Sequence, residues 1–291
     1  FGPRSRSHPV TSISHETHLG KRDSLYPKGL NTVQGQTNIF WMPLGFENTT
    51  TGPVSKMIPY GKQDISDKDI AAVVDVLKSD FLTQGPVVPA FERAVATKVC
   101  GTYAVASNSA TSSLHLACLA LGVGAGDRVW TSPITFVASA NCALYCGAQI
   151  DFVDIDPATF NLSVDCLADK LAVAEKNGTL PKVVIPVHMC GQSCDMRGIS
   201  ELARQYGFAI IEDASHAIGG RYQGDYIGGN SHSDITVFSF HPVKIITSAE
   251  GGMATTNDQN LADRMRRFRE HGVTRERDLM AEEPDGAWRY E

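Results

Sequence analysis

The sequence predicts an α/β fold in which helices cover both faces of a mainly parallel β-sheet. Short, continuous apolar runs at residues 183–187, 208–211 and 235–240 are typical of strands that are buried on both faces. Segments with a helical period separate these runs, as they do in strand–helix–strand units. In sheets of this kind ligands bind beyond the carboxyl ends of the strands, so we expect the functional residues there.

The first helix is expected to begin at residue 67. Ser66 is a typical N-cap residue, because its hydroxyl can accept a hydrogen bond from a free N–H of the first turn. Apolar residues then recur at i, i+3, i+4 and i+7, which is the period of an amphipathic helix. These residues are Ile70, Val73, Val74 and Leu77.

A second helix is expected over residues 109–121, where glycines at its C-terminal end would stop it. Further short apolar runs predict strands at residues 127–131 and 150–153. A further helix is expected near residues 199–206. No internal repeat is visible, so the elements are expected to form one sheet with its covering helices.

The composition limits the class of protein. The chain has 291 residues, of which 42% are apolar and 20% charged, and this suits one large globular domain or two small ones. Its formal net charge of −6 argues against nucleic-acid binding, which usually requires a basic face. The sequence contains no run of 18 or more apolar residues, so it predicts no membrane-spanning helix.

The cysteines argue against a disulfide framework, because there are seven of them in a chain that is not small. Cys142 and Cys146, like Cys190 and Cys194, are spaced C-x3-C rather than the C-x2-C of common zinc sites. No histidine pair stands close by in sequence to complete a site. We therefore expect reduced thiols in a cytoplasmic protein, with no bound metal.

Both ends of the chain differ from its middle. Residues 1–56 are rich in Ser, Thr, Gly, Pro and Asn, and they lack both a hydrophobic period and the apolar core of a secretory signal. We expect them to be a disordered N-terminal extension, followed by one folded domain over residues 57–291. Residues 288–291 carry no helix cap or closing turn, so the chain is expected to be cut inside that domain.

Four polar segments lie at predicted strand ends or helix starts. The first, Asn108-Ser109-Ala110-Thr111-Ser112, opens the second helix. Hydroxyl groups at a helix N-terminus, together with free backbone N–H groups and the positive end of the helix dipole, form a site for phosphate. The simpler alternative is N-capping by Ser109 or Thr111.

The second segment, Glu212-Asp213-Ala214-Ser215-His216, directly follows an apolar strand. A carboxylate here could keep a pyridine nitrogen protonated, which would make the ring an electron sink. The alternative for Glu212 is a structural salt bridge. The alternative for His216 is a buried imidazole whose hydrogen bonds are satisfied.

The third segment carries Lys244, just after the run at residues 235–240. Lysine is rarely buried without a reason, and loss of solvent lowers the pKa of its amine and makes it nucleophilic. The alternative is an ordinary surface lysine. Ser239 on one side could contact phosphate, and Gly251-Gly252 on the other would permit close approach of the backbone.

The fourth segment carries Phe136, whose ring could stack on a flat heteroaromatic ligand, although a core aromatic is the alternative. Taken together, the four segments offer a phosphate site, a carboxylate for a ring nitrogen, a nucleophilic amine and a stacking ring. This set suits pyridoxal 5'-phosphate. A chance occurrence of all four segments in one chain is much less expected than any one of the structural alternatives given for the single segments.

The order of these motifs resembles a known family. The segments N-S-A-T-S-S-L, T-S-P-I-T-F-V-A-S-A-N, I-I-E-D-A-S-H-A-I-G and F-S-F-H-P-V-K-I-I-T-S-A-E-G-G look like those of the DegT/DnrJ/EryC1 sugar-nucleotide aminotransferases. The resemblance covers residues 57–291. It implies the three-layer α/β/α large domain of type I pyridoxal-phosphate transferases, similar to aspartate aminotransferase. The opening M-I-P-Y-G-K-Q-D-I-S, with F-L-T-Q-G-P and F-H-P-V-K, looks most like the pseudaminic-acid branch.

The resemblance implies roles for the site residues. Lys244 would hold the cofactor as a Schiff base and then move the proton between the substrate carbon and the cofactor. Asp213 would pair with the pyridine nitrogen, His216 would lie by the phenolic oxygen of the ring, and Phe136 would stack on the ring. The phosphate would be held by Thr111, Ser112 and Ser239, with Ala110 nearby.

The resemblance also implies the substrates and the assembly. Glutamate would donate the amino group to a 4-keto-6-deoxy UDP-sugar, as in the synthesis of bacterial surface glycans. Members of the family are homodimers whose active sites are shared across the interface. The positions that would contact the sugar nucleotide are Tyr60, Asp80, Phe81, Leu82 and Thr83, together with Ala110 and Ser239.

This sequence departs from the family pattern at its C-terminus, where the family continues into a phosphate-binding Asn and a small domain. We therefore expect residues 1–291 alone to be poorly active. One alternative is a family member that acts on a different keto-sugar, and another is a non-catalytic protein that keeps the fold. A dehydratase-type relative would carry His in place of Lys244, and a dehydrogenase would carry a G-x-G-x-x-G motif that is absent here.

Overall fold

The computed structural model describes residues 61–274 and 277–280 of the chain. The chain divides into two units, Phe1–Met57 and Ile58–Glu291, and the first lies wholly outside the described residues. The expectations for residues 1–56 and 288–291 therefore lie outside the described residues as well.

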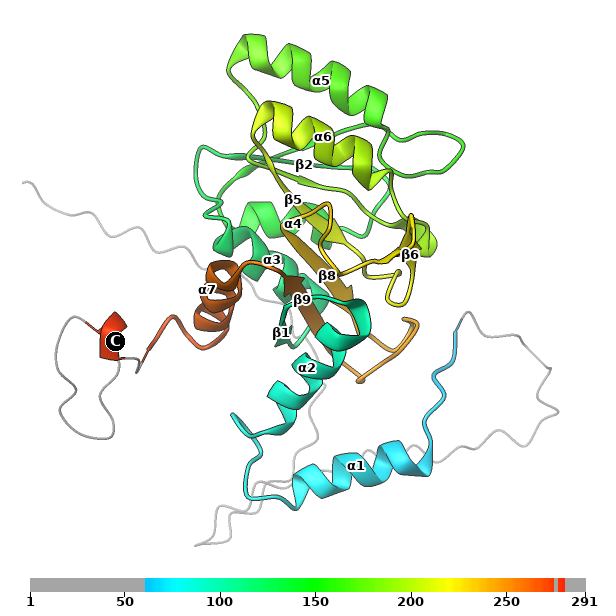
Figure 1. Cartoon of the computed structure of the whole chain (residues 1–291), viewed down its shortest axis with the longest axis vertical. Helices are drawn as coiled ribbons and strands as arrows, with labels where there is room; N and C mark the ends of the chain where they lie inside the picture. The colour runs from blue at the N-terminus through cyan, green and yellow to red at the C-terminus, as the bar shows by residue number, and fades with distance from the viewer. Residues whose placement is uncertain (1–60, 275–276, 281–291) are drawn as a thin grey trace, which may run out of the picture. The chain divides into compact units, whose positions relative to one another are not determined.

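A seven-stranded sheet with the order β1-β9-β8-β5-β4-β2-β3 forms the centre of the second unit (Figure 1). Every pairing is parallel except the two that β9 makes, with β1 and with β8. Six strands thus run one way and β9 runs against them, as a mainly parallel sheet requires. The strands are β1 (Tyr103–Ser107), β2 (Arg128–Thr131), β3 (Gln149–Phe152), β4 (Val183–Ile185), β5 (Ala209–Asp213), β8 (Ile235–Ser239) and β9 (Gly252–Thr256).

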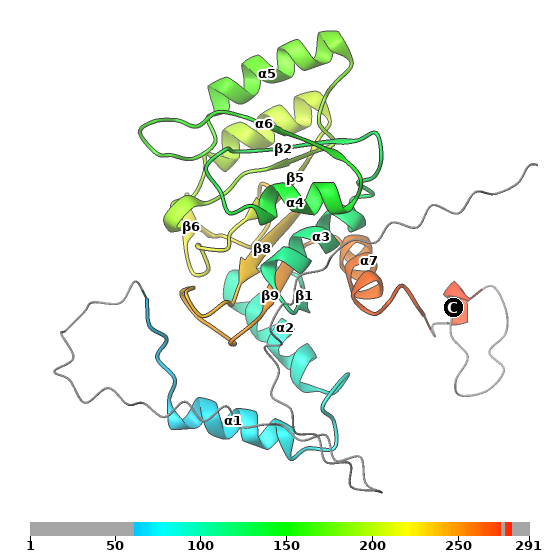
Figure 2. The same ribbon diagram turned by 180° about the vertical axis from the view of Figure 1, so that it is seen from behind.

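Helices cover both faces of this sheet, so the predicted three-layer α/β/α arrangement is confirmed (Figures 1 and 2). On one face lie α3 (Ala110–Ala120), α4 (Ala138–Tyr145) and α7 (Gln259–Arg269). The other face is covered by α2 (Val87–Val99), α5 (Val164–Asn177) and α6 (Met196–Tyr206). A short hairpin of β6 (Arg221–Tyr222) and β7 (Asp225–Tyr226) follows β5, and two short 3-10 turns lie at Met189–Gly191 and Arg277–Leu279.

Side chains alternate between the two cores along each strand, as the period of a strand requires. In β2, Val129 packs under α3 and α4, whereas its neighbour Trp130 packs under α5 and α6. In β8, Val237 and Phe238 divide in the same way. Burial on both faces explains why the strands appear in the sequence as continuous apolar runs.

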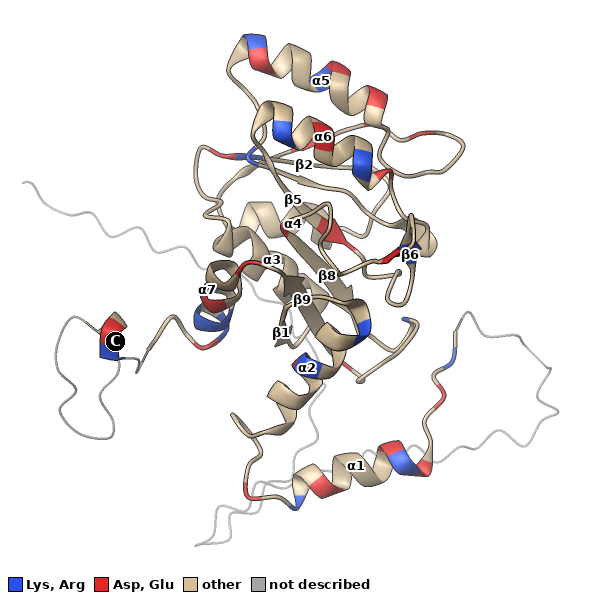
Figure 3. Ribbon diagram, viewed as in Figure 1, with Lys and Arg blue, Asp and Glu red and all other residues tan. Residues whose placement is uncertain are grey.

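Figure 3 shows residues of both signs on α5, α6 and α7, while the strands carry few charges. Among the described residues, three acids are buried: Glu92 on α2, and Glu212 and Asp213 at the carboxyl end of β5. Within the described part of the chain, no helix is long and apolar enough to cross a bilayer.

The first helix, α1 (Asp67–Leu77), begins where the sequence predicts. Ser66 caps it and forms a reciprocal capping box with Asp69. Its apolar side, however, is not buried among the described residues, since Ile70, Val73 and Leu77 are 53%, 61% and 66% exposed. The hydrophobic period thus predicted the helix correctly, but it did not indicate what covers the apolar side.

Candidate active site

Loops that follow the carboxyl ends of the parallel strands line a cavity of about 370 Å³. This volume lies within the range of small-molecule sites. Its walls come from the α3 N-terminus, the segments after β2, β4, β5 and β8, and the start of β9. Among the lining residues are Ala110, Thr111, Thr135, Phe136, His188, Asp213, His216, Ser239, His241, Lys244, Glu250 and Gly251.

The N-terminus of α3 lines part of the cavity with the small residues and helix start that the anion-site prediction requires. Ser109 is the N-cap, and its hydroxyl accepts the backbone N–H of Ser112 at 3.1 Å. Ala110 and Thr111 line the cavity, and the first N–H groups of a helix have no acceptor within the helix. Ser112 is not among the lining residues, because its hydroxyl donates to the side chain of Asn108 at 2.6 Å. N-capping and anion binding therefore use different atoms of one segment.

Gly252 sets the position of this helix end. A Cβ placed on Gly252 would lie 2.3 Å from the carbonyl carbon and oxygen of Ser109 and 2.5 Å from the nitrogen of Ala110. Only a residue without a side chain permits that approach between β9 and the start of α3. The close backbone approach predicted at Gly251-Gly252 is thus present, and it is made to the protein's own backbone at the start of α3.

Lys244 lies in the loop after β8, half-buried in the cavity wall. The loop is closed at its base, because the backbone of Phe240 bonds to Gly251 at 2.9 Å and to Ser248 at 3.0 Å. Burial lowers the pKa of the Lys244 amine below its usual value, although the negative charge of Asp213 partly opposes this shift. The amine therefore loses its proton more readily than that of a surface lysine.

Asp213 ends β5 with its carboxylate in the cavity and its backbone held in the sheet. Its Oδ2 accepts the hydroxyl of Ser139 at 2.6 Å, and its Oδ1 accepts the backbone N–H of Ser215 at 3.1 Å. The backbone N–H of His188 donates to the Asp213 carbonyl at 3.0 Å. These bonds hold the acid in one orientation.

The remaining predicted cofactor residues also meet at this cavity. Phe136 lines it with a ring that is 72% exposed, so this ring is not a core aromatic. Ser239, at the end of β8, is buried and also lines the cavity. The imidazole of His216 is half-buried, and both burial and the charge of Lys244 lower its pKa, against the influence of Asp213.

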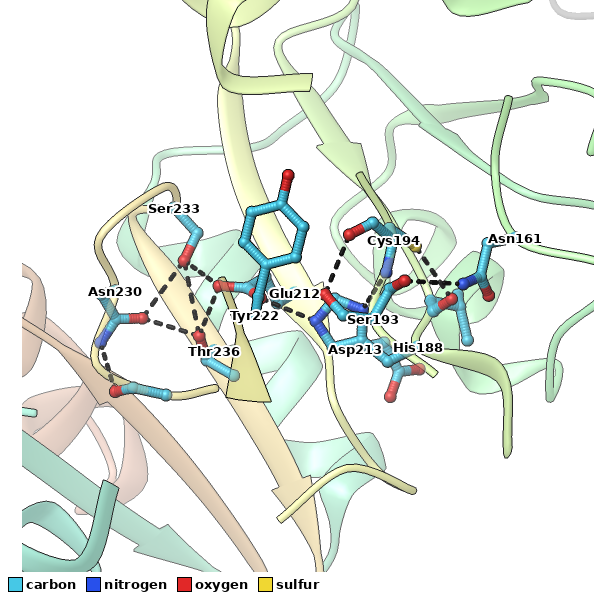
Figure 4. Close-up of polar contacts among 12 residues, drawn as sticks. Asn161, His188, Ser193, Cys194, Glu212, Asp213, Tyr222, Asn230, Ser233 and Thr236 are labelled. Atoms are coloured by element: carbon cyan, nitrogen blue, oxygen red, sulfur yellow. Dashed lines mark hydrogen bonds and ion pairs between the residues drawn. The ribbon is translucent and has the colours of Figure 1, made fainter. Parts of the chain in front are cut away.

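Glu212 does not line this cavity, and its carboxylate instead pairs with a buried histidine, which is a structural role. Its Oε2 lies 2.7 Å from Nε2 of His188, which is fully buried (Figure 4). The backbone N–H of Cys194 donates to Nδ1 of the same ring at 3.2 Å, so Nε2 is the nitrogen left to donate to Glu212. Ser233 and Thr236 donate to the other carboxylate oxygen. Burial raises the pKa of Glu212, but the bonds from His188 and these hydroxyls outweigh it and lower the pKa.

Of the predicted sugar-nucleotide residues, Ala110 and Ser239 line the cavity, whereas residues 80–83 do not. Asp80, Phe81, Leu82 and Thr83 occupy an exposed bend between α1 and α2. Tyr60 lies outside the described residues. All seven cysteines are unpaired, and no group of three or more potential metal ligands lies together in the described part of the chain.

Some residues in or next to the cavity were not identified from the sequence. Ser139 and Thr135 lie in the quoted segment around Phe136, but nothing local indicates that they reach Asp213. His188 follows the strand β4, and the rule that strand ends carry ligands could have singled it out. Glu250 and His241 flank Lys244 in the same loop and also line the cavity.

The comparisons with known proteins agree with this geometry. Residues 63–284 match the model of the DegT/DnrJ/EryC1/StrS aminotransferase family. The chain belongs to this family. Family membership confirms the resemblance drawn from the motifs, and the family depends on pyridoxal phosphate.

Individual family members are similar over most of this chain. A Campylobacter jejuni protein, UDP-4-amino-4,6-dideoxy-N-acetyl-beta-L-altrosamine transaminase, is 41% identical over 221 residues, which cover 76% of this chain and 57% of that protein. The solved structure of Helicobacter pylori PseC, an aminotransferase involved in the biosynthesis of pseudoaminic acid, matches with a TM-score of 0.69 and 31% identity, over 78% of this chain and 59% of that one.

A third similar structure is the PLP form of Spr1654, a candidate sugar aminotransferase from Streptococcus pneumoniae. It matches with a TM-score of 0.68 and 31% identity, over 80% of this chain and 60% of that one. The chain spans 57–58% of the length of the curated relatives it matches.

The residues of the DegT/DnrJ/EryC1/StrS site fit pyridoxal phosphate. The α3 N-terminus offers unpaired N–H groups for an anion, and the contact at Gly252 keeps that end of the cavity in place. An amine of lowered pKa and a doubly hydrogen-bonded carboxylate line the same cavity. The donor set matches the phosphate, the aldehyde and the ring nitrogen of this cofactor.

Proposed function

We propose that the protein is a pyridoxal-phosphate-dependent transaminase that moves an amino group from glutamate to the keto carbon of a 4-keto-6-deoxy UDP-sugar. The observation that carries the proposal is the shared cavity of Lys244, Asp213 and the α3 N-terminus. These groups come from three separate segments of the chain, and packing alone would not require them to meet.

When bound, pyridoxal phosphate supplies the electron sink that lets an amino group pass between two carbon skeletons. Lys244 would hold the cofactor covalently through Nζ. The lowered pKa of that amine favours its nucleophilic form, and the freed amine then carries a proton to and from the substrate carbon.

Asp213 would keep a proton on the ring nitrogen of the cofactor. Its two hydrogen bonds hold the carboxylate in place and leave lone pairs for the cavity. Phe136 would stack on the ring, and His216 would lie near the phenolic oxygen. The phosphate would be held by Thr111 and Ser239, with Ala110 beside it and Ser112 contributing through the first turn of α3.

The pseudaminic-type substrate rests on the motifs near residues 57–66, 81–86 and 240–244 and on the names of two relatives. Tyr60 and residues 80–83 would contact the sugar nucleotide. Phe81 and Leu82 are 58% and 70% exposed, so their apolar surface is free to meet a ligand or a partner. The unpaired cysteines support a cytoplasmic location.

A homodimer with shared active sites would cover the exposed apolar side chains. Besides those of α1, these include Val243, Ile245 and Ile246 in the Lys244 loop, which are 50%, 63% and 49% exposed. Sedimentation equilibrium tests this part of the proposal. A mass of twice the chain supports it, and a monomer at tens of micromolar contradicts it.

The test of the function is a single-turnover amino transfer. The chain, in excess and loaded with cofactor, is mixed with 15N-labelled glutamate and with 4-keto-6-deoxy UDP-sugar, a 3-keto UDP-sugar or a 4-keto TDP-sugar. Excess protein allows even slow chemistry to be followed by mass spectrometry. We expect the label in the product of the 4-keto UDP-sugar. Labelling of the TDP product alone would contradict the proposed nucleotide, and no labelling of any sugar would contradict the transaminase.

A further inference from the structure

Ser139 makes the shortest side-chain hydrogen bond to Asp213. It is the second residue of α4, it is fully buried, and its Oγ lies 2.6 Å from Oδ2 of Asp213, 74 residues further along the chain. Ser139 does not line the cavity itself, so it contacts the acid from behind.

The direction of this bond follows from the acid. An ionised carboxylate only accepts hydrogen bonds, so the hydroxyl of Ser139 donates its single proton to Asp213. The oxygen of Ser139 is then an acceptor for Thr135, whose Oγ1 lies 2.8 Å away. Thr135 also lies 3.2 Å from the carbonyl oxygen of Phe136, but the contact with Ser139 is the shorter one. A chain of two hydroxyls thus runs from the cavity wall, through Thr135, to the carboxylate.

The second oxygen of Asp213 is held separately. Its Oδ1 accepts the backbone N–H of Ser215 at 3.1 Å. With one donor on each oxygen, the carboxylate cannot rotate without losing a bond. The lone pairs left over are those available to a group in the cavity.

Packing alone does not account for a serine at position 139. Its helical neighbours Ala138 and Ala140 are also buried and carry no hydroxyl. A buried hydroxyl is costly unless it is hydrogen-bonded, and here its partner is the acid of the site.

We propose that Ser139, supported by Thr135, is a positioning residue that keeps the Asp213 carboxylate oriented for the ring nitrogen of the cofactor. This inference rests on the proposed function, because it assigns Ser139 a role only through Asp213. It predicts an effect that depends on the ring nitrogen, which a purely structural serine would not show.

The experiment measures equilibrium binding of two ligands by the full chain. One ligand is pyridoxal phosphate, and the other is its 1-deaza analogue, in which a CH group replaces the ring nitrogen. We expect Ser139→Ala to weaken the binding of pyridoxal phosphate by about tenfold, as loss of one hydrogen bond to a charged group implies. Binding of the deaza analogue should change by less than about twofold.

Further variants separate positioning from folding. Thr135→Val removes the second hydroxyl at nearly constant shape and should lower the affinity for pyridoxal phosphate. Thr135→Ser keeps the hydroxyl, so its affinity should stay close to that of the wild type. In an Asp213→Asn background, Ser139→Ala should have no additional effect on that affinity. The control is Ser200→Ala, which removes another buried helical hydroxyl that bonds a backbone carbonyl on α6. Thermal melting confirms that each variant is folded.

The outcomes distinguish the inference from the proposed function. If the wild-type chain does not bind pyridoxal phosphate, the proposed function fails, and the inference fails with it. If the wild-type chain binds and Ser139→Ala binds equally well, only the inference is overturned. An equal loss for both ligands would show that Ser139 acts on the fold alone, which also overturns the inference.

Discussion

Gly252→Ala is expected to damage the phosphate end of the cavity without removing any functional group. The new Cβ would lie 2.3 Å from two backbone atoms of Ser109, whereas ordinary contact begins at 3.4 Å. The start of α3 and the strand β9 must therefore separate by roughly 1 Å. Neither side can yield by turning a side chain, since every atom in the contact belongs to the backbone.

We expect the free energy of unfolding to fall by about 3 kcal/mol, the upper part of the range for overpacked sites. The displaced helix end should also bind phosphate less well. The affinity for pyridoxal phosphate should drop by at least about tenfold, while the affinity for pyridoxal, which lacks the phosphate, should stay nearly constant.

Urea unfolding and equilibrium binding of the two ligands measure these effects. The matched control is Gly124→Ala, because no atom lies within 4 Å of a Cβ at Gly124. Its unfolding free energy should change by no more than about 0.5 kcal/mol. A Gly252→Ala protein that binds pyridoxal phosphate as tightly as the wild type would refute the role given to this contact.

Three other outcomes follow from the site. Glu212→Ala leaves the buried Nε2–H of His188 without its acceptor and should lower the free energy of unfolding by about 1–3 kcal/mol. The exposed, helical Glu201→Ala should cost at most about 0.5 kcal/mol in the same urea titration, and equal losses would contradict the buried pair. The rate of cofactor attachment to Lys244 should rise with pH, because only the neutral amine reacts. It should reach its plateau at a pH below the ordinary lysine pKa of 10.5. A rate that still rises past pH 10.5 would contradict the lowered pKa of Lys244. Asp213→Asn should bind the cofactor more weakly and, once saturated with it, should perform single-turnover amino transfer about a hundredfold more slowly. An unchanged rate would remove Asp213 from the chemistry.

The parts of the fold and site that could be predicted share one physical cause. Strands buried on both faces need continuous apolar runs, and parallel strands bring their carboxyl ends to one edge. Asp213 and Lys244 follow such runs directly, so their meeting could be expected from the chain order. The N-cap at Ser109 was equally local, because capping depends on residues within one turn.

The strand β9 could not be predicted in this way. It contains the buried threonines Thr255 and Thr256 in place of apolar residues. Their hydroxyls are satisfied by carbonyl oxygens of distant residues, Gly228 at 3.0 Å and Asp234 at 2.7 Å. A pattern rule that scores threonine as polar misses such a strand.

The long-range polar contacts are the other unpredicted part. The bond from Ser139 to Asp213 joins segments 74 residues apart, and only the packing of α4 on the sheet brings them together. The same holds for His188 and Glu212, whose contact decided between a structural and a chemical role for Glu212. Local sequence identified the acid pair, but only the fold assigned each acid its partner.

The most direct test of the account is covalent attachment of pyridoxal phosphate to Lys244. The cofactor is added to the full chain, the visible spectrum is recorded, and the sample is reduced with borohydride and mapped by peptide mass spectrometry. The account predicts a visible absorption band that disappears on reduction, a cofactor mass on the peptide containing Lys244, and neither signal in Lys244→Ala. A wild-type chain without the band, or with the cofactor attached to a different lysine, would contradict it.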